Sequence, residues 1–255
     1  MDYWKNKEQN ALKARKHTKE MKENFSSRIS QCVKDTIIYN EDFKHNKVSP
    51  KTQKIVIVNT DSVSAIFNYS IGKTAVLNFA SYKNPGGQFI NGSIAQEECL
   101  CHSSFLYNVL SEFTIDYYDW NNHNKNKALY YNRALFTPDV LFMSGNSICF
   151  CDVITCAAPN KKAAQKYCNV SNHDNRKALS SRIEFVLEIA KKEGIESLIL
   201  GAYGCGVFGQ DPYEVASIFK EMLTAMPSFK NVIFAIPDNT STNYKAFSKV
   251  FRERS

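Results

Sequence analysis

The sequence has no apolar run that approaches the roughly 20 residues needed to cross a membrane as a helix. Its first 25 residues are charged throughout and lack the apolar core segment of a secretory signal peptide. We therefore expect a protein of a reducing intracellular compartment, the cytoplasm or the nucleus, with no membrane partner. In such a compartment the eight cysteines are expected to be free thiols.

The cysteines also lack the spacing of a structural zinc site, which usually shows a C-x-x-C pair closed by a second pair. Cys149, Cys151 and Cys156 lie in a run with strand character, and a single leucine separates Cys99 from Cys101. Buried cysteine, acting as a small hydrophobic residue, explains these patterns better than metal does. The sequence therefore predicts neither a metal nor a cofactor.

A formal net charge of +7 and a pI near 8.9 would suit an acidic partner, such as nucleic acid or a polyphosphate ligand. Many of the lysines, however, fall in the first fifty residues, where they can solvate an N-terminal helix. We favour this explanation and do not expect nucleic acid as a partner. At 255 residues and 44% hydrophobic, the chain can bury the core of one large domain, which we expect to be a monomer.

Short apolar runs alternate with helical patterns along the chain. Strands are expected at residues 55–58, 75–80, 140–143, 148–156, 197–201 and 231–236, and helices at residues 1–35, 95–113, 179–193, from 212 onward and 244–254. Residues 117–127 are polar and are expected to form a loop. This order predicts a three-layer α/β/α sandwich around a mixed, largely parallel sheet. Residues 1–50 would form a helical extension packed on a core of residues 51–255.

The stretch from residue 84 to residue 98 combines two features that carry chemistry. Gly86 and Gly87 lack a Cβ, so they can adopt positive φ and let amide N–H groups converge on an anion. Glu97 and Glu98 are neighbours on the first turn of an expected helix, where repulsion and burial can raise the pKa of one of them. Acidic residues also favour a first turn for reasons of charge alone. The short spacing from the glycine pair favours a functional site for a phosphorylated sugar.

A second glycine-rich loop, residues 201–209, follows another expected strand and precedes another expected helix. It contains Gly-x-Gly but not the full dinucleotide fingerprint, and it lacks the Gly-Lys-Ser/Thr ending of a P-loop. A tight strand-to-helix connection would also explain its glycines. Ligands of α/β sheets collect at the carboxyl ends of strands, beside helix N-termini. We therefore favour a diphosphate site that shares one crevice with the first glycine loop.

Both motifs resemble those of the microbial-type poly(ADP-ribose) glycohydrolases. Asn84-Pro-Gly-Gly-Gln, followed by Gln96-Glu97-Glu98, is similar to that family's glycine run and Gln-Glu-Glu signature, and residues 201–212 are similar to its second phosphate loop. The resemblance extends over roughly residues 10–250. It implies a macrodomain fold, poly(ADP-ribose) or ADP-ribosylated proteins as partners, and hydrolysis of ribose–ribose O-glycosidic bonds to release ADP-ribose.

The resemblance also implies roles for individual residues in catalysis. Glu98 would be the catalytic acid, protonated because burial and Glu97 raise its pKa, and it would then activate water. Glu97 would hold hydroxyls of the ribose at the scissile bond, and Gln96 would support this arrangement. Gly86 and Gly87 would lie under that ribose and the adjoining phosphate.

The remaining expected contacts bind the rest of the ligand. They are Asp61 for the adenine amino group, Asn84 for a ribose, the N–H groups of Gly204, Cys205, Gly206 and Val207 for the diphosphate, Phe208 against the terminal ribose, and Tyr244 or Phe247 stacked on adenine.

One residue of the signature departs from the family. Gln88 stands where the family usually has a third glycine, and we expect its Cβ and amide to crowd or reshape the loop near the ribose. Three alternatives stay open: a macrodomain that binds ADP-ribose without hydrolysis because of Gln88, a mono(ADP-ribosyl) hydrolase, and, because of the basic charge, a nucleic-acid binder.

Overall fold

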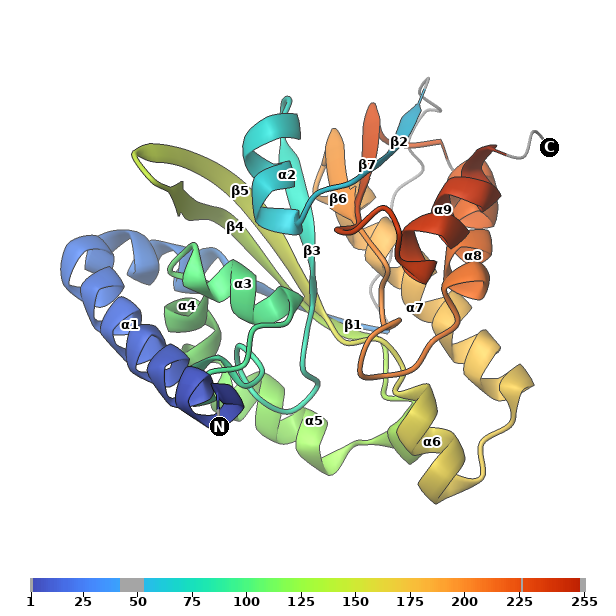
Figure 1. The fold of residues 1–255 in the computed structure, drawn as a ribbon, viewed down its shortest axis with the longest axis horizontal. Coiled ribbons are helices and arrows are strands. Elements are labelled where there is room, and N and C mark those ends of the chain that lie inside the picture. Colours follow the sequence, from blue (N-terminus) through green and yellow to red (C-terminus); the bar gives the residue numbers. More distant parts are fainter. Residues whose placement is uncertain (1, 42–52, 226, 253–255) are drawn as a thin grey trace.

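The computed structural model describes residues 2–41, 53–225 and 227–252. Within them, a single seven-stranded sheet forms the centre of the molecule, and helices cover both of its faces (Figure 1). The strand order is β1-β4-β5-β3-β6-β7-β2. The strands are β1 (Ile37–Asn40), β2 (Lys54–Val58), β3 (Thr74–Phe79), β4 (Arg133–Ser144), β5 (Ser147–Cys156), β6 (Ser197–Leu200) and β7 (Asn231–Ala235). The expected α/β sandwich is confirmed.

The sheet is mixed and largely parallel. From β5 through β3, β6 and β7 to β2 every neighbouring pair is parallel, whereas β4 pairs antiparallel with both β1 and β5. Strands covered on both faces read as continuous apolar runs, and alternate residues of β3 point to opposite layers. Ala75 and Leu77 pack in one core cluster, and Val76 packs in the other.

Helices of the two layers come from different parts of the chain. The helices are α1 (Asp2–Asp35), α2 (Ser62–Tyr69), α3 (Gln96–His102), α4 (Leu106–Glu112), α5 (Trp120–His123), α6 (Lys161–Cys168), α7 (Asn172–Lys192), α8 (Pro212–Ala225) and α9 (Thr242–Arg252), with shorter turns η1 (Phe89–Asn91), η2 (Thr114–Asp119) and η3 (Asn126–Ala128). In Figure 1, α1–α4 lie on one side of the sheet and α7–α9 on the other. None of the helices in the described residues is long and apolar enough to cross a membrane.

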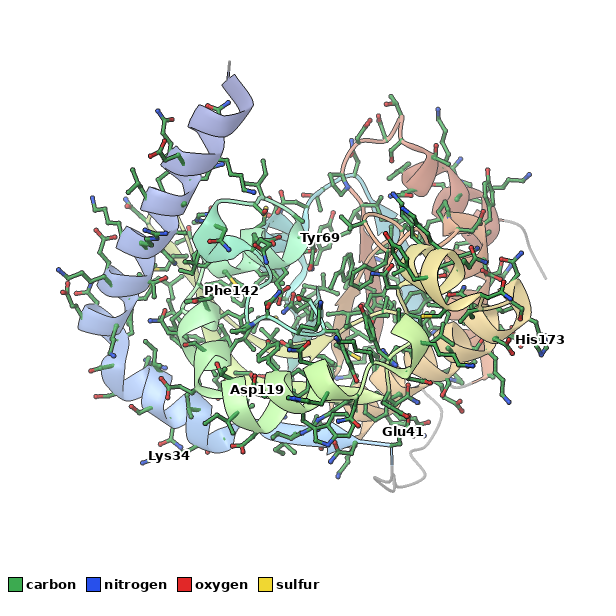
Figure 2. The ribbon with its side chains drawn as sticks, turned by 90° about the horizontal axis from the view of Figure 1, so that it is seen from below. Lys34, Glu41, Tyr69, Asp119, Phe142 and His173 are labelled. Atoms are coloured by element: carbon green, nitrogen blue, oxygen red, sulfur yellow. The ribbon has the colours of Figure 1, made fainter. Side chains whose placement is uncertain are left out.

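The first helix is polar but packs against the rest of the domain. Ala14, Met21, Ile29 and Cys32 are buried in the core cluster that also contains residues of α3 and α4. Seen from below, α1 runs along the outside of these helices (Figure 2). The strand β1 that follows was not predicted, although it extends the sheet beside β4. The domain boundary expected at residue 50 falls outside the described residues.

Two other local predictions were wrong. The single helix expected over residues 95–113 is divided into α3 and α4, because the hydroxyl of Ser104 donates to Leu100 O and accepts from the N–H of Leu106. The loop expected over residues 117–127 contains the π-helical end of η2, α5 and η3, which the buried rings of Tyr117 and Tyr118 anchor to the core.

The strand expected at residues 140–143 is also longer than predicted. β4 begins at Arg133, and its pairing with β5 shifts register between Thr137 and Val140. Pro138 lies in this irregularity, where its missing N–H does not interrupt a regular ladder. Proline therefore concealed the first half of the strand from pattern analysis.

Candidate active site

The first glycine loop, residues 80–95, joins β3 to α3 and runs directly against two carboxyl groups. Gly86 and Gly87 have φ of +62° and +61°, a conformation that favours glycine. A Cβ on Gly87 would lie 2.6 Å from Glu98 Oε1 and 2.9 Å from Glu97 Oε2. The structure thus brings together the glycine pair and the acidic pair, as the sequence predicted.

Gln96 fastens the start of α3 to the sheet. Its Oε1 accepts a hydrogen bond from the N–H of Phe79 at 2.8 Å, and its Nε2 donates to Leu77 O at 2.9 Å and to Ser62 Oγ at 3.1 Å. Because Glu97 and Glu98 follow Gln96 directly, these hydrogen bonds fix the part of the backbone from which both glutamate side chains extend. Gln96 therefore supports the start of α3, and its expected part in arranging the ribose stays a prediction.

Glu97 is buried, and the protein holds both of its carboxyl oxygens. Oε2 accepts from the N–H of Ser81 at 2.7 Å, and Oε1 accepts from Asn78 Nδ2 at 3.2 Å. Burial raises the pKa of Glu97 from its ordinary value of 4.5 to about 8; the Ser81 N–H acts in the opposite direction, and the charge of Glu98 adds to the increase. The raised pKa of Glu97 was not expected, since sequence reasoning assigned that property to Glu98.

Glu98 is also buried, but only one of its oxygens is held. Oε1 accepts from the N–H of Gln88 at 2.9 Å. Oε2 is buried and has no hydrogen-bond partner among the described residues. An unsatisfied buried acceptor is costly, and such atoms in native structures often mark the place of a ligand or a reacting group. Glu98 Oε2 is therefore the carboxyl oxygen of this pair whose hydrogen bonding the described residues leave incomplete.

Gln88 does not crowd the first glycine loop, contrary to expectation. Its φ of −112° and ψ of 28° are open to any residue, unlike the backbone angles of Gly86 and Gly87. The side chain is exposed, and its Oε1 accepts from Asn91 Nδ2 at 2.8 Å. Asn84, at the start of the loop, is exposed as well, and its carbonyl accepts the turn hydrogen bond from the N–H of Gly87.

The second glycine loop, residues 201–211, joins β6 to α8 and borders a hollow of about 180 Å³. The hollow is lined by Gly204, Gly206, Val207 and Phe208 of this loop and by Gln96, the first residue of α3. Gly206 and Val207 are exposed, which leaves the turn open to a ligand. The N–H of Cys205 was expected to bind a diphosphate, but it donates to Ala202 O at 3.1 Å within the turn.

A second hollow, of about 440 Å³, continues the first across the carboxyl ends of β3, β6 and β7. Both hollows are lined by Phe79, Ala95, Gln96 and Ala202, so they form one cleft. Asp61 lies at its far end, where its carboxylate caps α2 by accepting from the N–H and the hydroxyl of Ser64. The cleft therefore extends from the second glycine loop to Asp61.

Neither aromatic residue proposed for adenine stacking lines this cleft. Phe247 is fully buried, with its ring centroid 5.1 Å from that of Phe234, so it presents no surface to a ligand. Tyr244 borders a different hollow, beside Lys249. Sequence reasoning missed the residues that do line the Asp61 end, which include Ile94, Cys99, Pro237, Asp238 and Asn243. An available signal was Ile94, an apolar residue in a polar loop, which is exposed.

The chain matches the family described as microbial-type PARG, catalytic domain, over residues 6–144, which is more than half of its length. The chain belongs to this family. It is accordingly a poly(ADP-ribose) glycohydrolase, which is a glycosidase.

Solved structures agree with this family along most of the chain. Poly(ADP-ribose) glycohydrolase from Thermomonospora curvata matches with a TM-score of 0.85 and 27% identity, over 96% of this chain and 100% of that one. The same protein bound to the inhibitor ADP-HPD matches with a TM-score of 0.82 and 26% identity, over 95% and 99%. The enzyme from Deinococcus radiodurans in complex with ADP-ribose has a TM-score of 0.76 and 28% identity, over 88% and 97%. No curated protein matches the chain in sequence.

Proposed function

We propose that Glu98 is the general acid with which this glycohydrolase cleaves the ribose–ribose O-glycosidic bond of poly(ADP-ribose). One observation carries the proposal: Glu98 Oε2 is buried and has no partner among the described residues, on a carboxyl group that the first glycine loop approaches closely. A substrate oxygen at this position would complete the hydrogen bonding of Oε2. Proton transfer would then take place without further movement of the side chain.

The carboxyl groups of Glu97 and Glu98 have different roles in the proposed reaction. Glu97 is held through both oxygens, so it is suited to orient hydroxyl groups of the ribose rather than to swing toward the leaving group. Burial raises the pKa of Glu97 to about 8, so Glu97 keeps its proton to a higher pH than an ordinary glutamate does. Surroundings that shift the pKa values of two adjacent carboxyl groups apart commonly give the two groups different roles in catalysis.

The reaction needs a proton donor and a stabilised cationic sugar. Glu98 donates a proton to the leaving ribose oxygen as the bond from that oxygen to the anomeric carbon breaks, which leaves an oxocarbenium-like centre. Ionised Glu98 then removes a proton from water as the water oxygen bonds to the anomeric carbon, and this step restores the acid and releases ADP-ribose. Negative charge from the bound diphosphate would stabilise the cationic centre.

The substrate follows the cleft. We place the adenosine at the Asp61 end, the diphosphate over the second glycine loop, and the terminal ribose between Phe208 and the acidic pair. The proposed contacts are Asp61, Asn84, Gly86, Gly87, Gln96, Gly204, Gly206, Val207 and Phe208, besides Glu97 and Glu98. ADP-ribosylated proteins are the proposed carriers of the polymer. Since one chain supplies all of these groups, a monomer suffices.

The decisive test is Glu98→Gln, with Glu112→Gln as the matched control on the exposed end of α4. We expect release of ADP-ribose from automodified poly(ADP-ribose) to fall by roughly 10²–10⁴-fold for Glu98→Gln. Affinity for free ADP-ribose, measured by calorimetry, should change little in either variant. Normal turnover by Glu98→Gln would reject the assignment. A wild-type chain that binds ADP-ribose but releases none from polymer would instead be a binding module.

A further inference from the structure

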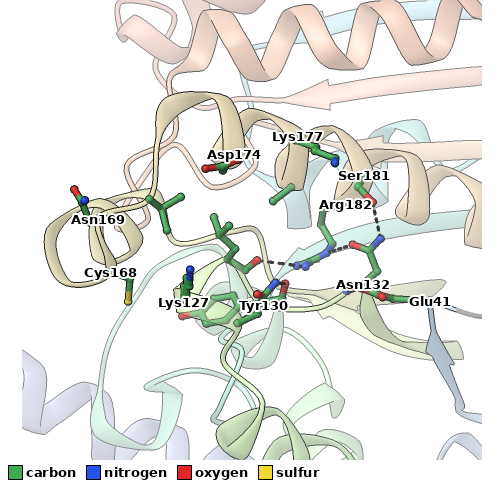
Figure 3. A pocket seen from close by; sticks show the side chains of 14 residues that line it. Glu41, Lys127, Tyr130, Asn132, Cys168, Asn169, Asp174, Lys177, Ser181 and Arg182 are labelled. Atoms are coloured by element: carbon green, nitrogen blue, oxygen red, sulfur yellow. Dashed lines mark hydrogen bonds between the residues drawn. The ribbon is translucent and has the colours of Figure 1, made fainter.

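Two additional hollows lie side by side outside the cleft, and together we call them the outer groove. The first has a volume of about 440 Å³ and lies between η3 and α7 (Figure 3). The second, of about 590 Å³, lies beside α5 and the start of β4. Glu41 and Asn132 line both hollows. Asn132 is held between them, since it donates to Ser181 Oγ at 2.8 Å and accepts from Arg182 Nε at 2.7 Å.

Each hollow contains a buried guanidinium group without a carboxylate partner among the described residues. Arg182 is 1% exposed, and besides Asn132 it donates to the carbonyl oxygens of Ala157 and Leu129. Arg133 is 8% exposed and donates to Asp116 O, while its Nε is buried with no partner among the described residues. Burying a cation is costly unless an anion compensates it. Arg133, whose Nε has no partner in the described part of the chain, therefore favours an anionic ligand in the second hollow, although Glu41 is also among the residues that line both hollows.

Aromatic rings line the second hollow next to Arg133. Trp120 is 41% exposed, and its ring centroid lies 6.0 Å from that of Tyr131, which is also exposed. The guanidinium of Arg133 lies 4.3 Å from the centroid of Trp120. Lys127 and Lys177 line the neighbouring hollow, where Figure 3 shows them on opposite sides. Exposed rings beside basic groups are the features with which proteins bind bases and phosphates of a single strand.

The outer groove and the cleft are neighbours across a pair of stacked tyrosines. Tyr82, which follows β3, donates to Asn124 O at 2.9 Å and accepts from the N–H of Tyr131 at 3.4 Å, so it contacts two residues that line the second hollow. Its ring stacks on that of Tyr130 at 3.9 Å, and Tyr130 lies edge-on to Phe208 at 6.2 Å. A polymer whose terminal ribose reaches Phe208 therefore has the outer groove beside it.

We propose that the outer groove binds a second ADP-ribose unit of the polymer, the one on the far side of the scissile bond. Its adenine stacks on Trp120 or Tyr131, and its diphosphate lies near Arg133 and the lysines of the rim. This proposal rests on the proposed function of the cleft. It makes the enzyme prefer polymer to single ADP-ribose units, because free ADP-ribose occupies the cleft alone.

The test uses binding, on a Glu98→Gln background that does not consume the polymer. Trp120→Ala should weaken the affinity for polymer of three or more units about tenfold, since one base would lose its stacking surface. Phe150→Ala is the control, because Phe150 is 43% exposed on the β4–β5 hairpin outside the groove. Affinity for free ADP-ribose should be unchanged in both variants, which also verifies that Trp120→Ala is folded.

A second pair of variants tests the charge. Lys177→Ala should reduce the dependence of log affinity for polymer on log salt by about 0.7, the value for one phosphate contact on a single strand. Lys34→Ala, at the exposed end of α1, should leave that slope unchanged.

The outcomes separate the two proposals. If Trp120→Ala binds polymer as tightly as Phe150→Ala does, the outer groove does not bind the polymer, although the function of the cleft stands. If the chain with intact Trp120 does not bind free ADP-ribose, the proposed function itself fails. If single-stranded oligoadenylate competes as well as polymer does, the groove is a nucleic-acid site and the inference is overturned.

Discussion

Gly92 is the point at which α1 presses on the first glycine loop, and it offers a strict test of how the loop is held. Its φ is +84°, and a Cβ there would lie 1.9 Å from Lys7 O and 2.9 Å from Ala11 N. Both of these atoms belong to the backbone of α1, so rotation of a side chain cannot relieve the contact. Four residues later the chain enters α3 and reaches the acidic pair. The N-terminal helix is therefore part of the support of the active site.

The cost of Gly92→Ala can be estimated from a comparison with Gly145→Ala. Gly145 also has a positive φ, +57°, but a Cβ there would meet no atom within 4 Å. A left-handed alanine costs about 1–2 kcal/mol, and both variants incur this cost. Gly92→Ala must in addition push α1 and the loop apart, for which overpacking costs of about 1–3 kcal/mol are typical. The difference between the two variants measures the contact alone.

Thermal unfolding and polymer hydrolysis together provide the assay. For a chain of this size 1 kcal/mol corresponds to about 2–4 °C, so Gly92→Ala should lower Tm by roughly 2–12 °C more than Gly145→Ala does. Its kcat at 25 °C should fall by up to about 10²-fold, because displacement of the loop moves the acidic pair. Gly145→Ala should retain wild-type kcat. Equal Tm values and equal activities of the two variants would refute the idea that α1 positions the loop.

Two further predictions concern the acidic pair and Gln88. Because burial raises the pKa of Glu97 to about 8, the folded chain keeps a proton that the unfolded chain loses above its ordinary pKa of 4.5, so stability falls as pH rises between these values, by up to about 1.4 kcal/mol per pH unit. Urea unfolding at pH 5 and pH 8 should show this loss in the wild type and not in Glu97→Gln; the same loss in both would assign it to another group. Gln88→Gly should change kcat by less than about twofold and lower stability by about 1 kcal/mol, because it increases backbone entropy in the unfolded chain and removes only an exposed hydrogen bond from Asn91. A large increase in polymer hydrolysis would show that Gln88 does obstruct the loop.

The part of the site that sequence predicted is the part formed by neighbours in the chain. Gly87 and the acidic pair are separated by about one short loop and one helical turn, so a strand before them and a helix after them suffice to bring them together. The parallel strands were equally predictable from the sequence, because burial on both faces requires continuous apolar runs such as β3 and β6. Periodicity and local spacing carry this information without knowledge of distant contacts.

Features that depend on distant contacts were not predictable in the same way. An aromatic residue on a terminal helix suits a ligand surface or a core equally well, and only the position of Phe234 places Phe247 in the core. Strand β1 is recognisable only through its pairing with β4, nearly a hundred residues later. Arg133 and Arg182 are charged residues of ordinary appearance in the sequence. Their burial follows from distant contacts, since Arg133 lies against Trp120 and donates to Asp116 O, and Arg182 donates to Asn132 and to backbone carbonyls.

The neighbouring glutamates illustrate how two adjacent carboxyl groups come to lie in different surroundings. Successive residues on a helix point about 100° apart, so a pair on the first turn of α3 must face two different surroundings. Glu97 turns toward the end of β3, where Asn78 and Ser81 hold both oxygens and burial favours the protonated form. Glu98 turns toward the first glycine loop, where a single backbone N–H holds one oxygen and the other has no partner among the described residues. Any side chain at Gly87 would occupy the space where these carboxyl groups converge, so the acidic pair by itself requires a glycine at this position.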